Sequence, residues 1–161
     1  MAREELKRVL HLLAGATLRD FDAETIGSRL RIQKAVYIFK ALGSPNAADY
    51  RYNLYIRGPY SPALAKDYYS LKGEGELRGA VPGAPPPTKA SPRTQAVIDA
   101  VKRGNDFLEA VTTAHWIAER NPGATQMQIR ETFKSKKPHL DSRFDEAWAF
   151  LVQHRLANGH T

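Results

Sequence analysis

The side chains that could do chemistry are spread thinly along this chain. No cysteine is present, and no nucleophile-elbow, P-loop or dinucleotide-binding motif occurs. The adjacent acids Asp145 and Glu146 point apart on a helix and so cannot share a proton. No two histidines are at i, i+4 spacing, and none has acids at metal-ligand spacing: His11, His115, His139, His154 and His160. We therefore predict no catalytic residue, cofactor or metal. An enzyme whose site converges from distant positions remains a third hypothesis.

Tyrosines and basic side chains are concentrated between residues 50 and 69. Six of the seven tyrosines fall there, with arginines and a lysine between them. Tyrosine buries a large ring while its hydroxyl stays in water, which suits a recognition surface. Three interpretations fit: a protein-binding face, a nucleic-acid platform of stacking rings and phosphate-binding cations, or ordinary core and surface. The predicted binding residues are Gln33, Tyr50, Arg51, Tyr52, Tyr55, Arg57, Tyr60 and Tyr69.

A second candidate site is a dense basic cluster formed by Lys134, Lys136 and Lys137. As phosphate contacts, these lysines would make nucleic-acid binding fall steeply with salt. As lysines near the end of a helix, they would instead interact favourably with the helix dipole. The helices predicted on either side, at 126–134 and 143–156, have the dimensions of a helix-turn-helix with a lengthened turn.

The elements that position the tyrosines form a helix, a strand, a tight corner and a second helix. We predict a helix with Ser28 as its N-cap, an apolar stripe from Leu30 to Leu42 and charged residues, Lys34 included, around the rest. A strand follows at 50–56, with Tyr50, Tyr52, Leu54 and Ile56 on one side. Gly58 and Pro59 are predicted to end the strand, and Ser61 to cap the next helix. If Gly58 has a positive φ, Gly58→Ala should destabilise this corner. Two alternatives fit Gln33: its amide bonds the backbone of this corner, or it is an exposed residue of the helix.

Two motifs in this stretch carry a resemblance to a known family. Residues 32–37 (IQKAVY) and 55–61 (YIRGPYS) resemble the two motifs of the YwgA-like family of small bacterial and archaeal proteins. That family is similar to the Panacea (SocA-type) domain of antitoxins. Segments 106–116 and 136–151 also resemble the family, so the likeness covers most of 28–156. It implies an antitoxin-like or adaptor role in which Tyr50 to Tyr69 meet a protein partner.

The rest of the chain is mostly helical by its periodicity. We predict helices at 3–13, 92–102 and 106–120, besides those named above. The predicted helix starts are Ser91, Asn105, a capping box of Thr125 and Gln128, and Ser142 or Asp141. A short strand at 76–81 would pair with the first and give a winged-helix-like element. The segment 82–92, PGAPPPTKASP, is predicted to be a linker or loop. The predicted fold is a mainly helical α+β bundle with one strand pair, in which 1–81 and 93–161 pack as a single globular unit.

Composition limits the class of partner. The 161 residues carry a formal charge of +7, which makes a polyanion worth testing, but the charge is spread over both halves. No apolar run approaches the ~20 residues of a membrane-spanning helix. The absence of cysteine is compatible with a cytoplasmic location. We expect a protein partner, with nucleic acid as the alternative.

Overall fold

The structure is a computed structural model that describes residues 1–77, 79 and 90–158. The described residues form seven α-helices, two 3-10 helices and one two-stranded antiparallel sheet, which confirms the predicted mainly helical α+β class. The elements are α1 (Arg3–Thr17), α2 (Ile26–Ala41), η1 (Pro45–Ala47), β1 (Asn53–Tyr55), β2 (Gly58–Tyr60), α3 (Pro62–Gly73), α4 (Pro92–Lys102), α5 (Asn105–Arg120), α6 (Gln126–Lys136), η2 (Pro138–Arg143) and α7 (Phe144–Gln153).

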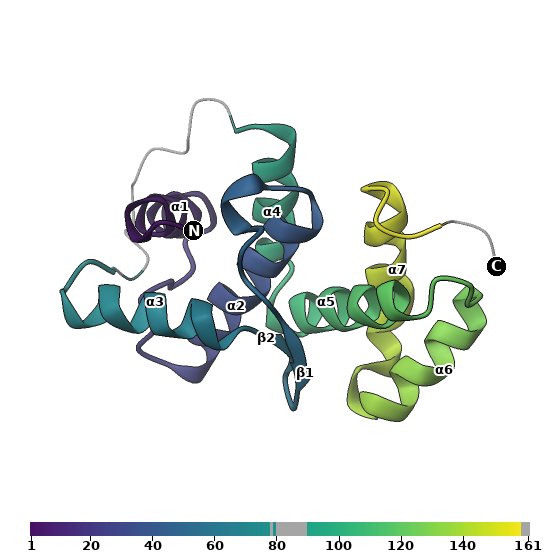
Figure 1. Ribbon diagram of the computed structural model, residues 1–161. Helices are drawn as coiled ribbons and strands as arrows, with labels where there is room; N and C mark the ends of the chain where they lie inside the picture. The colour runs from purple at the N-terminus through teal and green to yellow at the C-terminus, as the bar shows by residue number, and fades with distance from the viewer. Residues whose placement is uncertain (78, 80–89, 159–161) are drawn as a thin grey trace.

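Two helices, α2 and α5, form the centre of the molecule (Figure 1). Helix α2 packs against α4, α5 and β2, while α5 also packs against α6, α7 and η2. Helices α1 and α3 lie at one end in Figure 1, and α6 and α7 lie at the other. The segments before and after the proline-rich stretch therefore share one packed interface.

Both central helices are buried around most of their circumference. In α2 every residue from Ile32 to Phe39 is buried, and in α5 every residue from Phe107 to His115 is buried. A helix packed on several sides cannot keep a charged face. The prediction that Lys34 lies in a charged exposed face is therefore wrong, since Lys34 is only 2% exposed.

Side-chain caps start several helices where the sequence predicted them. Ser61 and Ser91 each accept the backbone N–H three residues on, and each is followed by proline at the first helical position. Thr125 and Gln128 form the predicted reciprocal capping box at the start of α6. These confirmed caps depend only on residues close together in the sequence.

Three other predicted caps are wrong. Helix α2 begins earlier, because Thr25 is its N-cap and accepts the Ser28 N–H at 3.0 Å. Asn105, predicted to cap, is already the first residue of α5. Neither Asp141 nor Ser142 caps α7, because the 3-10 turn η2 leads directly into that helix.

The strand pair is shorter than predicted and is placed differently. β1 pairs with β2 through a two-residue loop, Ile56 and Arg57, so the segment expected to end the strand is itself the second strand. Ile56, predicted to lie within the strand on the same side as Tyr50 and Tyr52, lies instead at the tip of the hairpin and is 91% exposed. The strand predicted at 76–81 does not form at the described residues 76, 77 and 79, and its other positions lie outside the described residues.

The proline-rich stretch predicted as a linker, 82–92, lies outside the described residues up to residue 89. Its described end joins the fold, because Ala90 packs against the core and Ser91 caps α4. Across the described ranges, no helix has the length and apolar character needed to cross a membrane.

Candidate functional site

Five of the eight predicted binding residues line one pocket. The pocket has a volume of about 170 Å³ and lies between α2, the β1–β2 hairpin and α3. We call it the tyrosine pocket. Its lining consists of Ile26, Arg29, Leu30, Gln33, Lys34, Tyr55, Arg57, Gly58, Tyr60, Tyr68 and Tyr69.

Four tyrosine rings form the walls of the tyrosine pocket. Tyr55 and Tyr60, from the two strands, meet edge to face with ring centroids 5.2 Å apart, and the Tyr68 and Tyr69 centroids are 4.9 Å apart. Tyr68 is buried, and this burial raises the pKa of its hydroxyl to about 12. Tyr55 and Tyr69 are about half exposed, at 49% and 48%. The pocket therefore combines fixed inner rings with outer rings that a partner can reach.

Exposed aliphatic side chains extend the tyrosine pocket onto the surface. Ile26, at the start of α2, is 55% exposed and lines the pocket. Ile56 projects from the tip of the neighbouring hairpin. Single exposed apolar residues are normal, but several around a concave site mark an interaction surface.

The charged groups of the tyrosine pocket are all basic: Arg29, Lys34 and Arg57. Arg29 donates to the Ala23 carbonyl at 3.1 Å, and Lys34 donates to the Pro59 carbonyl. Arg57 is exposed and makes no hydrogen bond or ion pair with any residue in the described ranges. Arg57 is therefore the cation available to an acidic group of a partner.

Gln33 fixes the corner at the rear of the pocket, the first of the two predicted alternatives. Its Nε2 donates to the Ser61 carbonyl at 3.0 Å, and its Oε1 accepts the Ser61 N–H at 2.9 Å. Both residues are almost fully buried. Gln33 satisfies two backbone groups that water cannot reach, so its role is to position the corner.

Three lysines hold the same segment by its backbone. Lys34 donates to the Pro59 carbonyl, Lys137 to the Ile56 carbonyl and Lys40 to the Tyr50 carbonyl. The donors come from α2 and from the end of α6, so the hairpin is attached to two separate helices. The path of this segment is therefore held through its main-chain oxygens.

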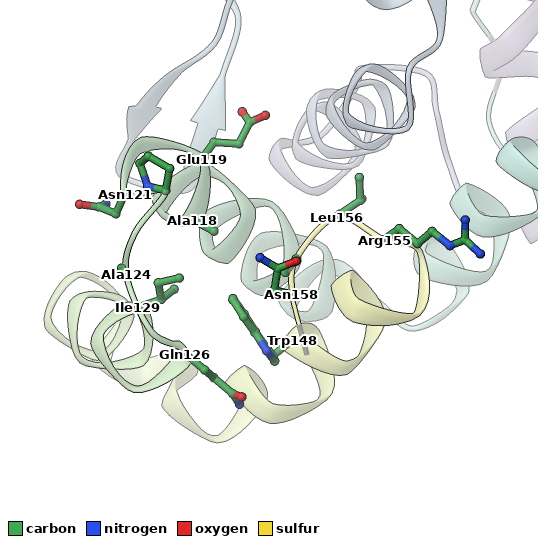
Figure 2. A pocket seen from close by; sticks show the side chains of 12 residues that line it. Ala118, Glu119, Asn121, Ala124, Gln126, Ile129, Trp148, Arg155, Leu156 and Asn158 are labelled. Atoms are coloured by element: carbon green, nitrogen blue, oxygen red, sulfur yellow. The ribbon is translucent and has the colours of Figure 1, made fainter. Parts of the chain in front are cut away.

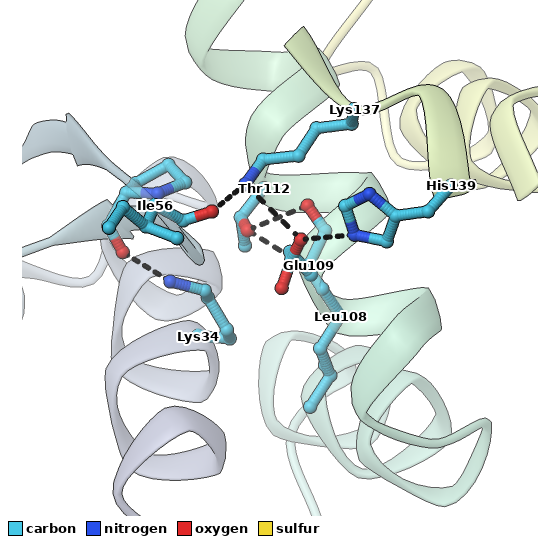
Figure 3. A network of polar contacts seen from close by, with 8 residues as sticks. Lys34, Ile56, Leu108, Glu109, Thr112, Lys137 and His139 are labelled. Carbon is cyan, nitrogen blue, oxygen red and sulfur yellow. Dashed lines mark hydrogen bonds and ion pairs between the residues drawn. The ribbon is translucent and has the colours of Figure 1, made fainter. Parts of the chain in front are cut away.

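Lys137 forms an ion pair with Glu109 on α5, and the charge of the same carboxylate also acts on Lys34 (Figure 3). Glu109 Oε2 lies 3.3 Å from Lys137 Nζ and 3.6 Å from His139 Nε2, at ion-pair distance but without hydrogen-bond geometry. Burial lowers the pKa of Lys34 to about 7, and Glu109 opposes that shift. The interior thus holds two lysines near one buried carboxylate. The stability of their charged forms depends on Glu109.

Stability should rise with pH as Lys34 loses its proton. Its pKa is about 7 in the folded chain against 10.5 ordinarily, so between these values the unfolded chain binds more protons. The free energy of unfolding should increase from about pH 7 to 9.5, by up to ~1.4 kcal/mol per pH unit. Urea titrations over this range test the rise, and the Lys34→Met variant should lose it. An equal rise in that variant would assign the effect to another group.

Gly58 needs both its positive φ and its missing side chain. Its φ is +95°, and an added Cβ would lie 3.0 Å from Thr113 Oγ1 and 3.2 Å from Lys34 Cε. Gly58→Ala should therefore lower the free energy of unfolding by about 1–3 kcal/mol, measured by urea denaturation. Gly73→Ala is the matched control, because Gly73 has open space around it and should show no loss. Equal stability of the two variants would contradict this role.

Three predicted residues lie outside the tyrosine pocket. Tyr50 is buried and donates to Asp67 at 2.6 Å, and burial and this bond raise its pKa. Tyr52 is also buried, on the side facing α5. Arg51 is exposed but does not line the pocket. The late start of β1 explains this division, because Tyr50 and Tyr52 precede the strand and pack into the core.

The predicted basic cluster does not form one surface. Lys134 and Lys136 are exposed, but Lys137 is only 4% exposed and belongs to the Glu109 network. The prediction of a three-lysine patch is therefore wrong for Lys137. Burial of this residue depends on Glu109, which lies far from it in the sequence.

The sequence interpretation missed several residues of the site. Ile26, Arg29 and Leu30 line the pocket from the first turns of α2. Their signal was the hydroxyl of Thr25, which starts the helix before Ser28. Nothing in the local sequence indicated that Glu109 belongs to the site, because a single acid in an apolar helix has the same sequence pattern whether its side chain is exposed or paired.

A larger pocket lies at the opposite end of the molecule (Figure 2). Its volume is about 340 Å³, and it lies between the end of α5, the start of α6 and the segment after α7. Trp148 is central among its lining side chains, and the indole Nε1 has no hydrogen-bond partner in the described part of the chain. None of the predicted binding residues lines it. Nowhere among residues 1–77, 79 and 90–158 are three or more acids or histidines grouped to hold a metal.

Comparison with known proteins gives no relative for this chain. No protein-family model matches it, no curated protein matches it and no solved structure matches it. The YwgA-like resemblance therefore stays a prediction, and the function is inferred from the geometry of the site.

Proposed function

We propose that the chain is a protein-binding module and that the tyrosine pocket takes one apolar side chain of its partner. The observation that carries this proposal is the joining of exposed apolar residues to a concave aromatic site. Ile26, Tyr55 and Tyr69 line the pocket while remaining about half exposed. Binding energy in protein interfaces concentrates where such anchors meet pockets.

The size and charge of the pocket define the partner's chemistry. About 170 Å³ suits a single large side chain, whereas sites for cofactors and drug-sized ligands are usually ~300–1,000 Å³. Arg57 places an unpaired cation at the pocket, and no acid lines it. The partner segment therefore carries an apolar anchor with an aspartate or glutamate beside it.

The biological role we propose follows from the family resemblance. An antitoxin-like or adaptor protein acts by holding another protein, and a preformed pocket suits that task because little ordering is needed on binding. The lysines and Gln33 that hold the hairpin support such preformation. In this proposal the partner is a protein that the chain regulates.

Nucleic acid is the second candidate, favoured by tyrosine rings beside cations with no acid in the lining. The bonding and burial of the nearby cations argue against nucleic-acid binding. Arg29 and Lys34 already donate to backbone carbonyls, and Lys137 is buried. Arg57 alone is a weak basis for binding that depends on several phosphate contacts.

Lys34 is the one group of the pocket whose perturbed pKa would suit an enzyme. A reactive lysine must reach its substrate, but Lys34 is 2% exposed and its Nζ is bonded to the Pro59 carbonyl. The lowered pKa of Lys34 therefore follows from its burial in the fold. We propose no enzymatic role for this lysine.

A random peptide library displayed on phage tests the proposal without a known partner. We expect enriched peptides to share a large apolar residue next to an acid. Tyr69→Ser should weaken a selected peptide by at least about tenfold, as expected for loss of an anchor. Arg57→Glu should weaken it too, and replacing the peptide's acid by lysine should restore binding. Arg51→Glu, the control, should have no effect, because Arg51 lies outside the pocket.

The nucleic-acid alternative has a test of its own. Fluorescence anisotropy with duplex DNA, single-stranded DNA and RNA at about 50 and 200 mM salt detects phosphate-driven binding. Saturable nucleic-acid binding that falls with salt and is lost in Arg57→Glu, together with no enriched peptide, would replace the protein-binding proposal.

A further inference from the structure

A second small pocket lies between the C-terminal halves of α2 and α5, away from the tyrosine pocket. Its volume is about 160 Å³. We call it the α2–α5 pocket. Its polar lining includes Tyr37, Lys40, Tyr52, His115, Trp116 and Arg120.

Two polar groups of the α2–α5 pocket lack a partner. The Tyr52 hydroxyl and the Trp116 indole Nε1 are buried and bond to nothing in the described part of the chain. Tyr52 as a whole is only 8% exposed. A buried donor left unpaired costs about 1–3 kcal/mol, so two in one pocket indicate that something outside the chain accepts their hydrogens.

The neighbouring side chains of the α2–α5 pocket, Tyr37 and His115, are bonded to each other. The Tyr37 hydroxyl and His115 Nδ1 are 2.7 Å apart, and the Tyr37 ring meets the rings of Tyr52 and His115 edge to face. Burial lowers the pKa of His115, which keeps the imidazole neutral. If Tyr37 donates to Nδ1, the hydrogen of His115 is on Nε2, 3.9 Å from Glu119 Oε1.

The charge around the α2–α5 pocket favours an anion. Lys40 and Arg120 line it, and the Arg120 guanidinium lies 3.7 Å from the centre of the Trp116 ring. Glu119, the acid of the lining, has a side chain that is 62% exposed and can turn to solvent. The indole is a donor only, so its partner must supply a lone pair.

We propose that the α2–α5 pocket binds a small carboxylate, whose oxygens accept from the Tyr52 hydroxyl and the Trp116 indole. Arg120 balances its charge, and Lys40 adds positive charge at the pocket while its Nζ also donates to the Tyr50 carbonyl. A volume of 160 Å³ equals about five waters at ~30 Å³ each, which suits an acid of a few carbons. This site is independent of the tyrosine pocket, and its ligand is a small molecule instead of a protein.

The experiment is an NMR titration of the whole chain with sodium propionate at constant ionic strength, observing the two indole N–H signals. The chain has two tryptophans, so the Trp148 indole is an internal control, and Trp116→Phe assigns the signals. We expect a saturable shift of the Trp116 signal and none of the Trp148 signal. Propionamide, the neutral analogue, and inorganic phosphate should bind at least tenfold more weakly.

Tyr52→Phe removes only the unpaired hydroxyl. We expect it to raise the propionate Kd at least tenfold while the melting temperature stays equal or rises, because no internal hydrogen bond is lost. Tyr60→Phe, on the tyrosine pocket, should leave the Kd unchanged. The proposal is overturned if propionate gives no saturable shift, as expected were water the only occupant. It is also overturned if propionamide binds equally or if Tyr52→Phe binds as the wild type does.

Discussion

Replacing Glu109 by glutamine is expected to lower the free energy of unfolding by about 3–5 kcal/mol. The glutamine keeps the shape of the side chain but removes the carboxylate that, among the described residues, lies within ion-pair distance of Lys137. Lys137 has a side chain that is 5% exposed, so its ammonium would remain buried beside the Ile56 carbonyl without a counter-charge. An uncompensated buried charge costs far more than a surface ion pair gains.

Urea denaturation at about pH 6 and pH 9 measures this loss. It should be larger at the lower pH, because Lys34 is then charged as well and Glu109 stabilises that charge. Glu131→Gln is the control, since Glu131 is an exposed residue of α6 and should change stability by no more than about 0.5 kcal/mol. A loss in Glu109→Gln as small as in the control would show that the buried lysines are neutral or reach water.

Replacing Gln33 by methionine is expected to cost about 1–3 kcal/mol. Methionine fills a similar volume but leaves the Ser61 N–H without a partner, while the Ser61 carbonyl keeps only its bond from the Ala65 N–H. Ser61 is 0% exposed, so water cannot replace the amide, and each buried backbone group left unpaired costs about 1–3 kcal/mol.

The urea midpoint measures the loss, and Gln153→Met, an exposed position at the end of α7, serves as the control. Binding of a selected peptide should weaken in Gln33→Met as well, because Ser61 both caps α3 and ends the corner behind the pocket. If Gln33→Met is less stable but binds the peptide with unchanged affinity, the corner does not shape the binding surface.

The parts of the fold that the sequence predicted depend on short-range chemistry. The capping box of Thr125 and Gln128 and the Ser61-Pro62 helix start each follow from a few neighbouring residues. For Gln33 the sequence left two alternatives, and the structure shows the bond to the corner instead of an exposed side chain. A polar amide in an otherwise buried helix face needs a partner, and the nearby corner has backbone groups to offer.

The errors arise where the answer depends on distant parts of the chain. Lys34 and Lys137 look like surface lysines until Glu109, on another helix, is brought between them. The hairpin was missed because its loop, Ile56 and Arg57, lacks the glycine or asparagine that usually marks a two-residue turn. Alternation of side chains also misplaced Ile56, since the rule stops applying where the strand ends.

The tyrosine pocket was predicted only in part for the same reason. Tyr55, Tyr60 and Tyr69 were named because of their residue type, and the structure brings them together. Ile26 and Arg29 were not named, because nothing in the local sequence shows that the first turns of α2 face the hairpin.

The way in which the hairpin is held has a consequence for how the protein can evolve. The groups that hold it, the three lysines and Gln33, bond main-chain atoms, which every amino acid possesses. Exchanges at the outward positions 53, 55, 56 and 57 therefore alter the chemistry presented while the loop keeps its path. The helices beneath determine the path of the hairpin, and substitutions at its exposed positions can change which partner it binds. New partners can be acquired by substitution at the tip alone, as in a scaffold with a variable loop.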